Sequence, residues 1–383
     1  MNWRRVVPAL LGAGVISGCG AAAAPVTTPA LQVQTAPLST SLVTPQGTWA
    51  VAVMGGSAGS QDNFWQLLVR PAGASRWSLV TPEGVADNGG LVAASGAGGT
   101  SLVVGFRPSQ GLAFSPLATS SDTGKSWTPG LLDAGLADVP DAMAVAPSGQ
   151  TLALLHDGGI EAAGTTGAAA TGQWSRLATL SALAASAPGR SCGLVAVNAV
   201  SFGPDNVPMA AGSCARRGVA GVFADTGGTW QAAGPALPAG FGGDQVQVLG
   251  LARTVLANTG SGNAALLAAG TDLLAAWSDG ARWTVSAPVA AARGVSASGF
   301  GPTGSVWVLL GGGRAETIGG PGGSWQALPL APAGTATLAP GPGSGGYDAL
   351  AVSGATLTVW QLTAAAWARV QVIKVPIEYG SSG

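Results

Sequence analysis

Ser120–Trp127 reads Ser-Ser-Asp-Thr-Gly-Lys-Ser-Trp. An Asp at the start of a turn can accept hydrogen bonds from backbone N–H groups two or three residues further on. The Gly that follows can supply the positive φ that closes such a turn. The stretch therefore predicts a polar hairpin turn that delivers Trp127 into the next strand.

Degraded copies of this turn recur along the chain, each followed by a tryptophan, at spacings of 42 to 56 residues. The tryptophans are Trp77, Trp127, Trp174, Trp230, Trp283, Trp325 and Trp367. An acidic residue and a glycine are kept as Asp122 with Gly124, Asp225 with Gly227, and Asp279 with Gly280. Within each period, short apolar runs between turn residues predict four antiparallel strands. Such a period is typical of a β-propeller blade.

We therefore predict an all-β fold, a seven-bladed β-propeller of four-stranded antiparallel blades that occupies residues 42–383. Each repeated tryptophan is expected on the outermost strand of its blade, where its ring can pack against the neighbouring blade.

Ser120–Trp127 resembles the Asp-box, or BNR repeat, of sialidase-like propellers, with Ser120 as the first residue of the pattern. The resemblance implies that the Asp-box turns lie on one face and the ligand-binding loops on the other. For a sialidase, the resemblance also implies three arginines that bind the substrate carboxylate, a Tyr nucleophile paired with a Glu, and an Asp that acts as acid and base. Only Tyr347 and Tyr379 are available as the tyrosine, and no Glu is close to Tyr347 in sequence. Catalysis is therefore not favoured.

Residues 1–18 have the layout of a secretory signal, with two arginines, an apolar stretch and small residues before Cys19. Ile16–Cys19 resembles the bacterial lipobox, in which the cysteine becomes the lipidated N-terminus. Residues 19–41 are rich in Ala, Pro and Thr and predict an extended tether. We expect an exported lipoprotein, anchored on the extracytoplasmic side of a membrane; the alternative is an ordinary signal peptide that happens to contain a cysteine.

Composition restricts the class of partner. Only 9% of the 383 residues are charged and the net charge is -1, which gives no basic field for nucleic acid. The 47% hydrophobic content argues against disorder. Cys192 and Cys214 predict one disulfide in an oxidising compartment, with two buried free thiols as the alternative. Two remaining cysteines and one histidine make no zinc-type cluster, so no metal and no cofactor is predicted.

The loops between the second and third strands are the expected binding rim, because loops carry function on a rigid scaffold. The candidate rim residues are Asp62, Trp65, Arg107, His156, Asp157, Arg216, Arg217, Arg314 and Glu316. Arginines in these loops can grip a carboxylate or the acidic surface of a partner. The alternative is that these charges are on loops only because soluble proteins place charges there.

These features together predict a non-catalytic binding or scaffold module at the cell envelope, with a protein or a glycan as its partner. Two alternatives stay open: a glycan-binding or glycan-hydrolysing protein of the sialidase type, and a structural envelope component.

The lipid anchor can be tested by replacing Cys19 with Ser. We expect Cys19→Ser to release the protein into the medium, because no thiol is left to carry the lipid; fractionation and blotting measure this. Retention of the variant in a detergent-extractable membrane fraction would contradict the lipoprotein prediction.

Overall fold

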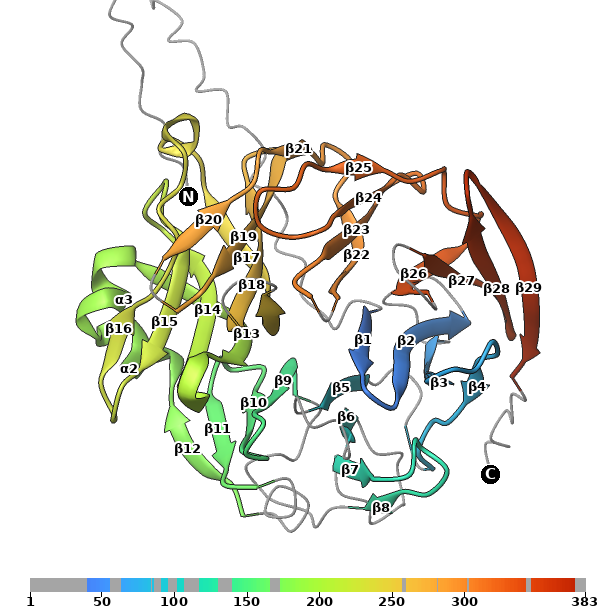
Figure 1. Cartoon of the computed structure of the whole chain (residues 1–383). Helices are drawn as coiled ribbons and strands as arrows, with labels where there is room; N and C mark the ends of the chain where they lie inside the picture. Colours follow the sequence, from blue (N-terminus) through green and yellow to red (C-terminus); the bar gives the residue numbers. More distant parts are fainter. Residues whose placement is uncertain are drawn as a thin grey trace, which may run out of the picture.

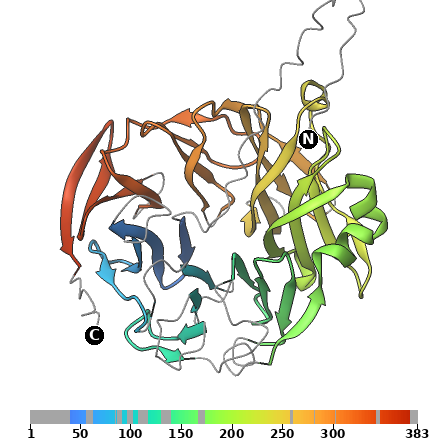
Figure 2. The same cartoon turned by 180° about the vertical axis from the view of Figure 1, so that it is seen from behind.

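The computed structural model describes residues 40–55, 63–83, 85, 91–95, 102–106, 117–129, 140–165, 173–256, 260–280, 282–301, 303–341 and 346–375. Cys19, Asp62 and Arg107 lie outside these residues, as do the predicted signal and all of the predicted tether before Thr40. The described chain forms antiparallel sheets placed side by side around a circle (Figure 1). The same circular order is seen from behind (Figure 2).

Three four-stranded sheets come first along the chain, each with its strands hydrogen-bonded in sequence order. The first contains β1 (Thr40–Thr44), β2 (Gly47–Gly55), β3 (Asn63–Pro71) and β4 (Ser78–Leu79). The second contains β5 (Leu91–Ser95), β6 (Leu102–Phe106), β7 (Leu117–Ser120) and β8 (Thr128–Pro129). The third contains β9 (Ala142–Val145), β10 (Thr151–Leu154), β11 (Ile160–Ala163) and β12 (Ser175–Ala178).

The middle of the chain forms one nine-stranded sheet. It contains β13 (Leu194–Phe202), β14 (Pro208–Cys214), β15 (Gly221–Asp225), β16 (Trp230–Ala232), β17 (Val246–Leu256), β18 (Gly260–Ala269), β19 (Asp272–Ser278), β20 (Trp283–Val285) and β21 (Val289–Ala290). The meanders β13–β16 and β17–β20 are joined by a single pairing, of Ser213 with Gln247.

Two further four-stranded sheets complete the described chain. They contain β22 (Val295–Phe300), β23 (Val306–Leu310), β24 (Ala315–Ile318) and β25 (Gln326–Ala327), followed by β26 (Thr335–Pro340), β27 (Tyr347–Ser353), β28 (Thr356–Thr363) and β29 (Ala366–Lys374). The predicted unit of four antiparallel strands is therefore confirmed. β1 begins at Thr40, inside the segment that the sequence assigns to the tether.

The sequence prediction missed two short helices between β12 and β13, α2 (Leu180–Ala185) and α3 (Ala187–Cys192). Both have caps that can be read in the sequence. The hydroxyl of Thr179 accepts from the N–H of Ala182, and that of Ser186 accepts from the N–H of Gly189. Gly193 ends α3 in the left-handed conformation. Among the described residues there are also two short 3₁₀ turns, Pro204–Asn206 and Ala239–Phe241.

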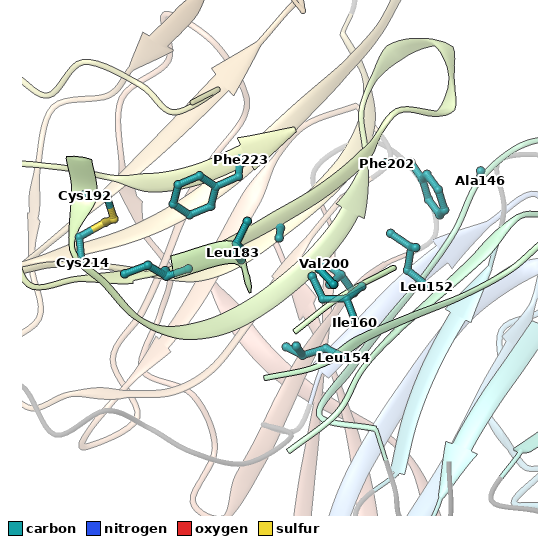
Figure 3. Packing of buried hydrophobic residues seen from close by; sticks show 13 residues of the cluster. Ala146, Leu152, Leu154, Ile160, Leu183, Cys192, Val200, Phe202, Cys214 and Phe223 are labelled. Carbon is teal, nitrogen blue, oxygen red and sulfur yellow. A yellow bond between two sulfur atoms is a disulfide. The ribbon is translucent and has the colours of Figure 1, made fainter. Parts of the chain in front are cut away.

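The core lies between neighbouring sheets rather than on one side of each. All residues of β10 and of β23 are buried, because both faces of these strands are covered by adjacent sheets. Figure 3 shows one such interface, where Leu152 and Leu154 of the third sheet approach Val200 of the next meander. Runs of apolar residues therefore form the central strands β10 and β23.

The turn at Ser120–Trp127 is closed by its own side chains. The carboxylate of Asp122 accepts from the N–H of Ser126 at 3.0 Å and from its hydroxyl at 2.6 Å. The hydroxyl of Ser120 donates to Asp122 and accepts from the N–H of Gly124. The hydrogen bonds from Ser126 lower the pKa of Asp122 to about 2. A Cβ on Gly124 would lie 2.8 Å from that of Val80, so only glycine fits.

The other two acidic copies of the turn differ from each other. The carboxylate of Asp279 accepts from the N–H of Arg282, and the hydroxyl of Ser278 accepts from the N–H of Gly280, which repeats the chemistry of the full turn. Asp225 instead ends β15, and its Oδ1 atom is buried without a hydrogen-bond partner. Its turn closes through the backbone, from the N–H of Thr226 to the carbonyl of Thr229.

The repeated tryptophans tie consecutive meanders together through their indole N–H groups. The indole of Trp127 donates to the carbonyl of Val80 at 2.9 Å, across to the preceding sheet. The same contact recurs as Trp283 to Ala233, Trp325 to Ala287, and Trp367 to Pro329, at 2.7 to 3.0 Å. Each accepting carbonyl follows the tryptophan of the preceding unit by three or four residues. Trp174 and Trp230 are half-buried and pack against the cores beside them.

Trp77 belongs to the first sheet and meets the last one. Its indole donates to Oδ2 of Asp348 in β27 at 2.8 Å, and Arg70 of β3 forms a buried ion pair with the same carboxylate. Gln371 of β29 both donates to the carbonyl of Trp77 and accepts from its N–H, each at 2.8 Å. We refer to these four residues as the seam. The seam joins the first and last sheets through side chains. Neither sheet contains a strand from the other end of the described chain, since the first is built from β1–β4 and the last from β26–β29.

The contribution of the indole contact can be measured by comparing Trp367→Phe with Trp360→Phe. Both changes remove similar apolar area from half-buried rings in the last sheet, but only Trp367 donates to the neighbouring sheet. We expect Trp367→Phe to cost about 1 kcal/mol more free energy of unfolding, because Pro329 loses its donor. Urea unfolding measures the difference, and equal losses would contradict the role of the contact.

Candidate binding site

The structure places most predicted rim residues where the sequence put them, in loops that join second and third strands. His156 and Asp157 lie between β10 and β11, Arg216 and Arg217 between β14 and β15, and Arg314 between β23 and β24. In the antiparallel meanders these loops lie at the same end of the strands, opposite the turns that precede the repeated tryptophans.

Two predicted rim residues are in different surroundings. Trp65 lies inside β3 with 9% of its surface exposed, packed in a core cluster, so its ring is not presented to a ligand. Glu316 lies inside β24 and is buried, and its Oε1 atom is 3.3 Å from Nε of Arg314. Arg314 is therefore paired with an acid already. Alternation along a strand could have predicted both positions if the strand boundaries had been drawn more exactly.

The charges of the third sheet also satisfy one another. Nδ1 of His156 is 3.4 Å from Oδ2 of Asp141, and both side chains are exposed. Arg176 of β12 contacts Glu161 through Nε and lies 3.9 Å from Asp157. These residues form a mixed patch in which His156 and Arg176 each have an acidic neighbour.

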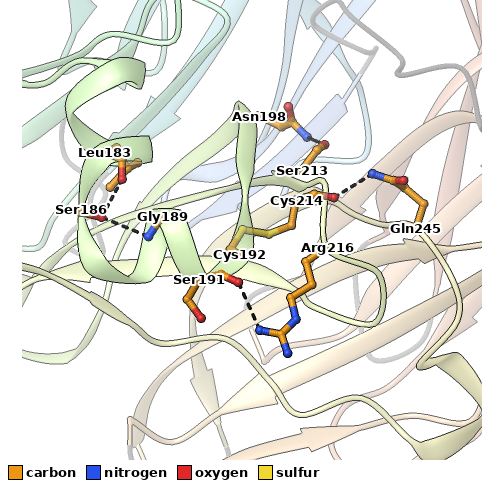
Figure 4. Close-up of a disulfide and its surroundings, with 10 residues drawn as sticks. All are labelled: Leu183, Ser186, Gly189, Ser191, Cys192, Asn198, Ser213, Cys214, Arg216 and Gln245. Atoms are coloured by element: carbon orange, nitrogen blue, oxygen red, sulfur yellow. Dashed lines mark hydrogen bonds between the residues drawn. A yellow bond between two sulfur atoms is a disulfide. The ribbon is translucent and has the colours of Figure 1, made fainter.

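The loop that carries Arg216 and Arg217 is held by the disulfide of Cys192 and Cys214, which confirms the predicted pairing. Both cysteines are buried, and the bond links the end of α3 to the end of β14 (Figure 4). A Cβ on Gly221 would lie 2.7 Å from the sulfur of Cys214, so the neighbouring strand passes the disulfide without a side chain.

Hydrogen bonds fix the backbone of this loop. The N–H of Arg216 donates to the carbonyl of Cys192 at 3.1 Å, and that of Ala215 to Gly193 at 2.8 Å. Gln245 donates from its side chain to the carbonyl of Cys214 at 2.7 Å. The loop is thus tied to α3 and to the following meander at the same time.

Three exposed arginines gather at this corner: Arg190 of α3, Arg216 and Arg217. Each guanidinium donates to one backbone carbonyl, those of Ala185, Ser191 and Gly243 respectively. Within the described part of the chain, none of the three has an acidic oxygen within 4 Å, in contrast to Arg70, Arg176 and Arg314. We call these three residues the arginine corner. A guanidinium offers five N–H donors, so most of them are left for a partner.

Tyr347, the tyrosine that lies among the described residues, is not presented to solvent as a sialidase mechanism would need. Tyr347 is 7% exposed, and its hydroxyl is 2.6 Å from that of Thr317. Burial raises its pKa, which disfavours the phenolate. The neighbouring Asp348 is held in the seam. The other tyrosine, Tyr379, lies outside the described residues.

No protein-family model matches the sequence, and no curated protein matches it. Solved structures do resemble the fold. A 6-phosphogluconolactonase-like protein from Bacteroides uniformis matches with a TM-score of 0.52 at 11% identity, over 86% of this chain and 97% of its own. The extracellular domain assigned to a one-component system of B. thetaiotaomicron matches with a TM-score of 0.50 at 8% identity, over 89% of this chain and 39% of its own. YCF48 from Cyanidioschyzon merolae matches with a TM-score of 0.47 at 16% identity, over 89% of this chain and 95% of its own.

The arrangement of the sheets and the likeness to the 6-phosphogluconolactonase-like protein define a β-propeller fold. At such low identity the likenesses concern the fold alone, since one propeller can host unrelated functions. Function therefore has to be argued from the loops of this chain.

Proposed function

We propose that this protein is a non-catalytic binding or scaffold module that recognises an acidic protein surface through its arginine corner. The observation that carries the proposal is that Arg190, Arg216 and Arg217 are exposed and have no acidic partner among the described residues. In a chain with only 9% charged residues, three such cations on one disulfide-linked corner are a specific feature.

The physical basis is preorganisation. The disulfide and the hydrogen bonds of the Arg216 backbone fix the loop before a partner arrives, so less conformational entropy is lost on binding. Guanidinium groups recognise carboxylates with two parallel hydrogen bonds, which adds geometric specificity to the charge attraction. Hydrogen bonds to backbone carbonyls orient the guanidiniums without neutralising them.

The proposal includes a ring of seven blades of the Asp-box type. The single pairing of Ser213 with Gln247 supports counting β13–β16 and β17–β20 as two blades. The side-chain closure of the Asp122 and Asp279 turns supports the Asp-box assignment.

The proposal also places the protein at the outer side of a membrane, held by lipid on Cys19. The disulfide supports an oxidising compartment. Within the residues that the structure describes, no helix is long and apolar enough to cross a bilayer. The burial of Tyr347 argues against the glycan-hydrolysing alternative.

The arginine corner can be tested by reversing its charge. Membranes that carry the full chain are treated with a cross-linker, and the proteins joined to it are identified. We expect Arg216→Glu with Arg217→Glu to reduce recovery of the specific partner at least about tenfold, because attraction becomes repulsion. A soluble peptide of ten glutamates should compete for the wild type, and recovery should fall with added salt.

The matched control reverses Arg282 and Arg369, which are exposed but lie away from this corner. Their variant should recover the partner as the wild type does. The proposal would be contradicted if the arginine-corner variant recovered as much partner as the wild type does, or if the control variant lost as much partner as the arginine-corner variant.

A further inference from the structure

Val195 places an exposed apolar side chain beside the arginine corner. It is the second residue of β13 and is 55% exposed, whereas Leu194 before it is buried and pairs with Cys214. Arg216 follows Cys214 by two residues, and its N–H still bonds back to the carbonyl of Cys192 (Figure 4). Along this ladder Val195 and Arg216 are about three positions apart, or about 10 Å. An extended segment of about four residues is therefore long enough to reach both.

A β-bulge exposes this valine. Leu194 pairs with Cys214 and Ala196 pairs with Ser213, so Val195 is an extra residue without a partner on β14. It is also the one exposed residue among the nine of β13. A bulge re-aims a side chain that regular alternation would place elsewhere, and bulges are frequent beside functional sites.

The backbone on both sides of the bulge is fixed. Gly193 has a φ of 66°, and its carbonyl accepts from the N–H of Ala215 at 2.8 Å. A Cβ on Gly193 would lie 3.3 Å from that of Ala215, so the two chains pass closely there. The disulfide of Cys192 and Cys214 links the same two segments. The valine is thus held on the same constrained corner as the arginines.

The charges of the arginine corner need an apolar neighbour to bind specifically. Ion pairs between exposed groups contribute little free energy, because water and salt screen them. In protein interfaces, a few residues at a desolvated centre carry most of the binding free energy, and arginine is often one of them. An apolar contact beside the guanidiniums excludes water and strengthens the polar contacts next to it.

We infer that the arginine corner and Val195 form one docking surface, an inference that rests on the function proposed for the arginine corner. The surface takes an acidic, extended segment of a partner protein that carries one aliphatic side chain about three residues from its carboxylates. The carboxylates pair with Arg216 and Arg217, and the aliphatic side chain covers Val195. A second copy of this surface would bring arginines against arginines, so the charge favours a different protein as the partner.

Two synthetic peptides test the aliphatic requirement. One is acetyl-Glu-Glu-Ser-Ser-Leu-Ser-Ser-Glu-Glu-amide, and the other has serine in place of the leucine. Glutamates on both sides of the leucine allow either chain direction. We expect the full chain to bind the leucine peptide at least about fivefold more tightly, because only leucine removes apolar area from water against Val195. Fluorescence anisotropy of the labelled peptides measures both dissociation constants.

Val195→Ser should bind the leucine peptide only as tightly as the serine peptide, with its affinity for the serine peptide unchanged. The matched control is Val255→Ser. Val255 is 57% exposed on β17, about 25 Å along that strand from Gln247, which pairs with Ser213 beside the corner. The control should keep the preference for leucine. Binding of the serine peptide shows that each variant is folded.

The outcomes separate this inference from the proposed function. Arg216→Glu with Arg217→Glu should lose both peptides. Equal affinity of the wild type for the two peptides, or a leucine preference that persists in Val195→Ser, would overturn the role of Val195 and leave the arginine corner standing. If neither peptide binds the wild type, or if the arginine variant keeps both, the proposed function fails together with the inference.

Discussion

The contact on which the ring depends is the hydrogen bond from a tryptophan of one meander to the preceding one. It recurs at Trp127, Trp283, Trp325 and Trp367, and the ring of each side chain adds apolar contact to the bond. In the first described sheet, Trp77 makes the equivalent contact with Asp348 of the last sheet. There the carboxylate of Asp348 replaces the carbonyl, and Arg70 supplies the positive charge that balances it.

Burial raises the pKa of Asp348 and lowers that of Arg70, and the charge of each residue opposes the pKa shift of the other. Removing either Arg70 or Asp348 therefore costs more free energy of unfolding than the ion pair itself contributes, because the other charge is left buried and unpaired.

This way of packing determines where function can lie. Strands covered on both faces must be apolar, so chemistry is left to the loops and to the axis of the ring. In the loops, Arg314 is paired with Glu316, whereas the three exposed guanidiniums of the arginine corner contact backbone carbonyls and have no acidic partner among the described residues. At the axis, the inner strands leave a small cavity that is lined by both polar and apolar residues.

Periodicity made the fold predictable, because the turn and its tryptophan mark each unit regardless of how far the rest has diverged. The four strands per unit and the disulfide followed from local patterns. The helices α2 and α3 were missed because they are short, although Thr179, Ser186 and Gly193 are recognisable caps. Arg216 and Arg217 were found as loop residues, but Arg190 was not, since its closeness to them depends on the disulfide. The seam could not be predicted, because Arg70 and Asp348 are far apart in sequence and are brought together only when the first and last sheets meet.

Hydrogen exchange measured by mass spectrometry tests the central claim, that the seam joins the first and last sheets. In Arg70→Met, which leaves Asp348 buried without its cation, the account predicts faster exchange in β1–β4 and β26–β29, while β13–β20 keep the protection of the wild type. Arg369→Met, on the exposed side of β29, should leave exchange unchanged. Unchanged protection in the two seam sheets of Arg70→Met, or a uniform loss of protection across all sheets, would contradict the account.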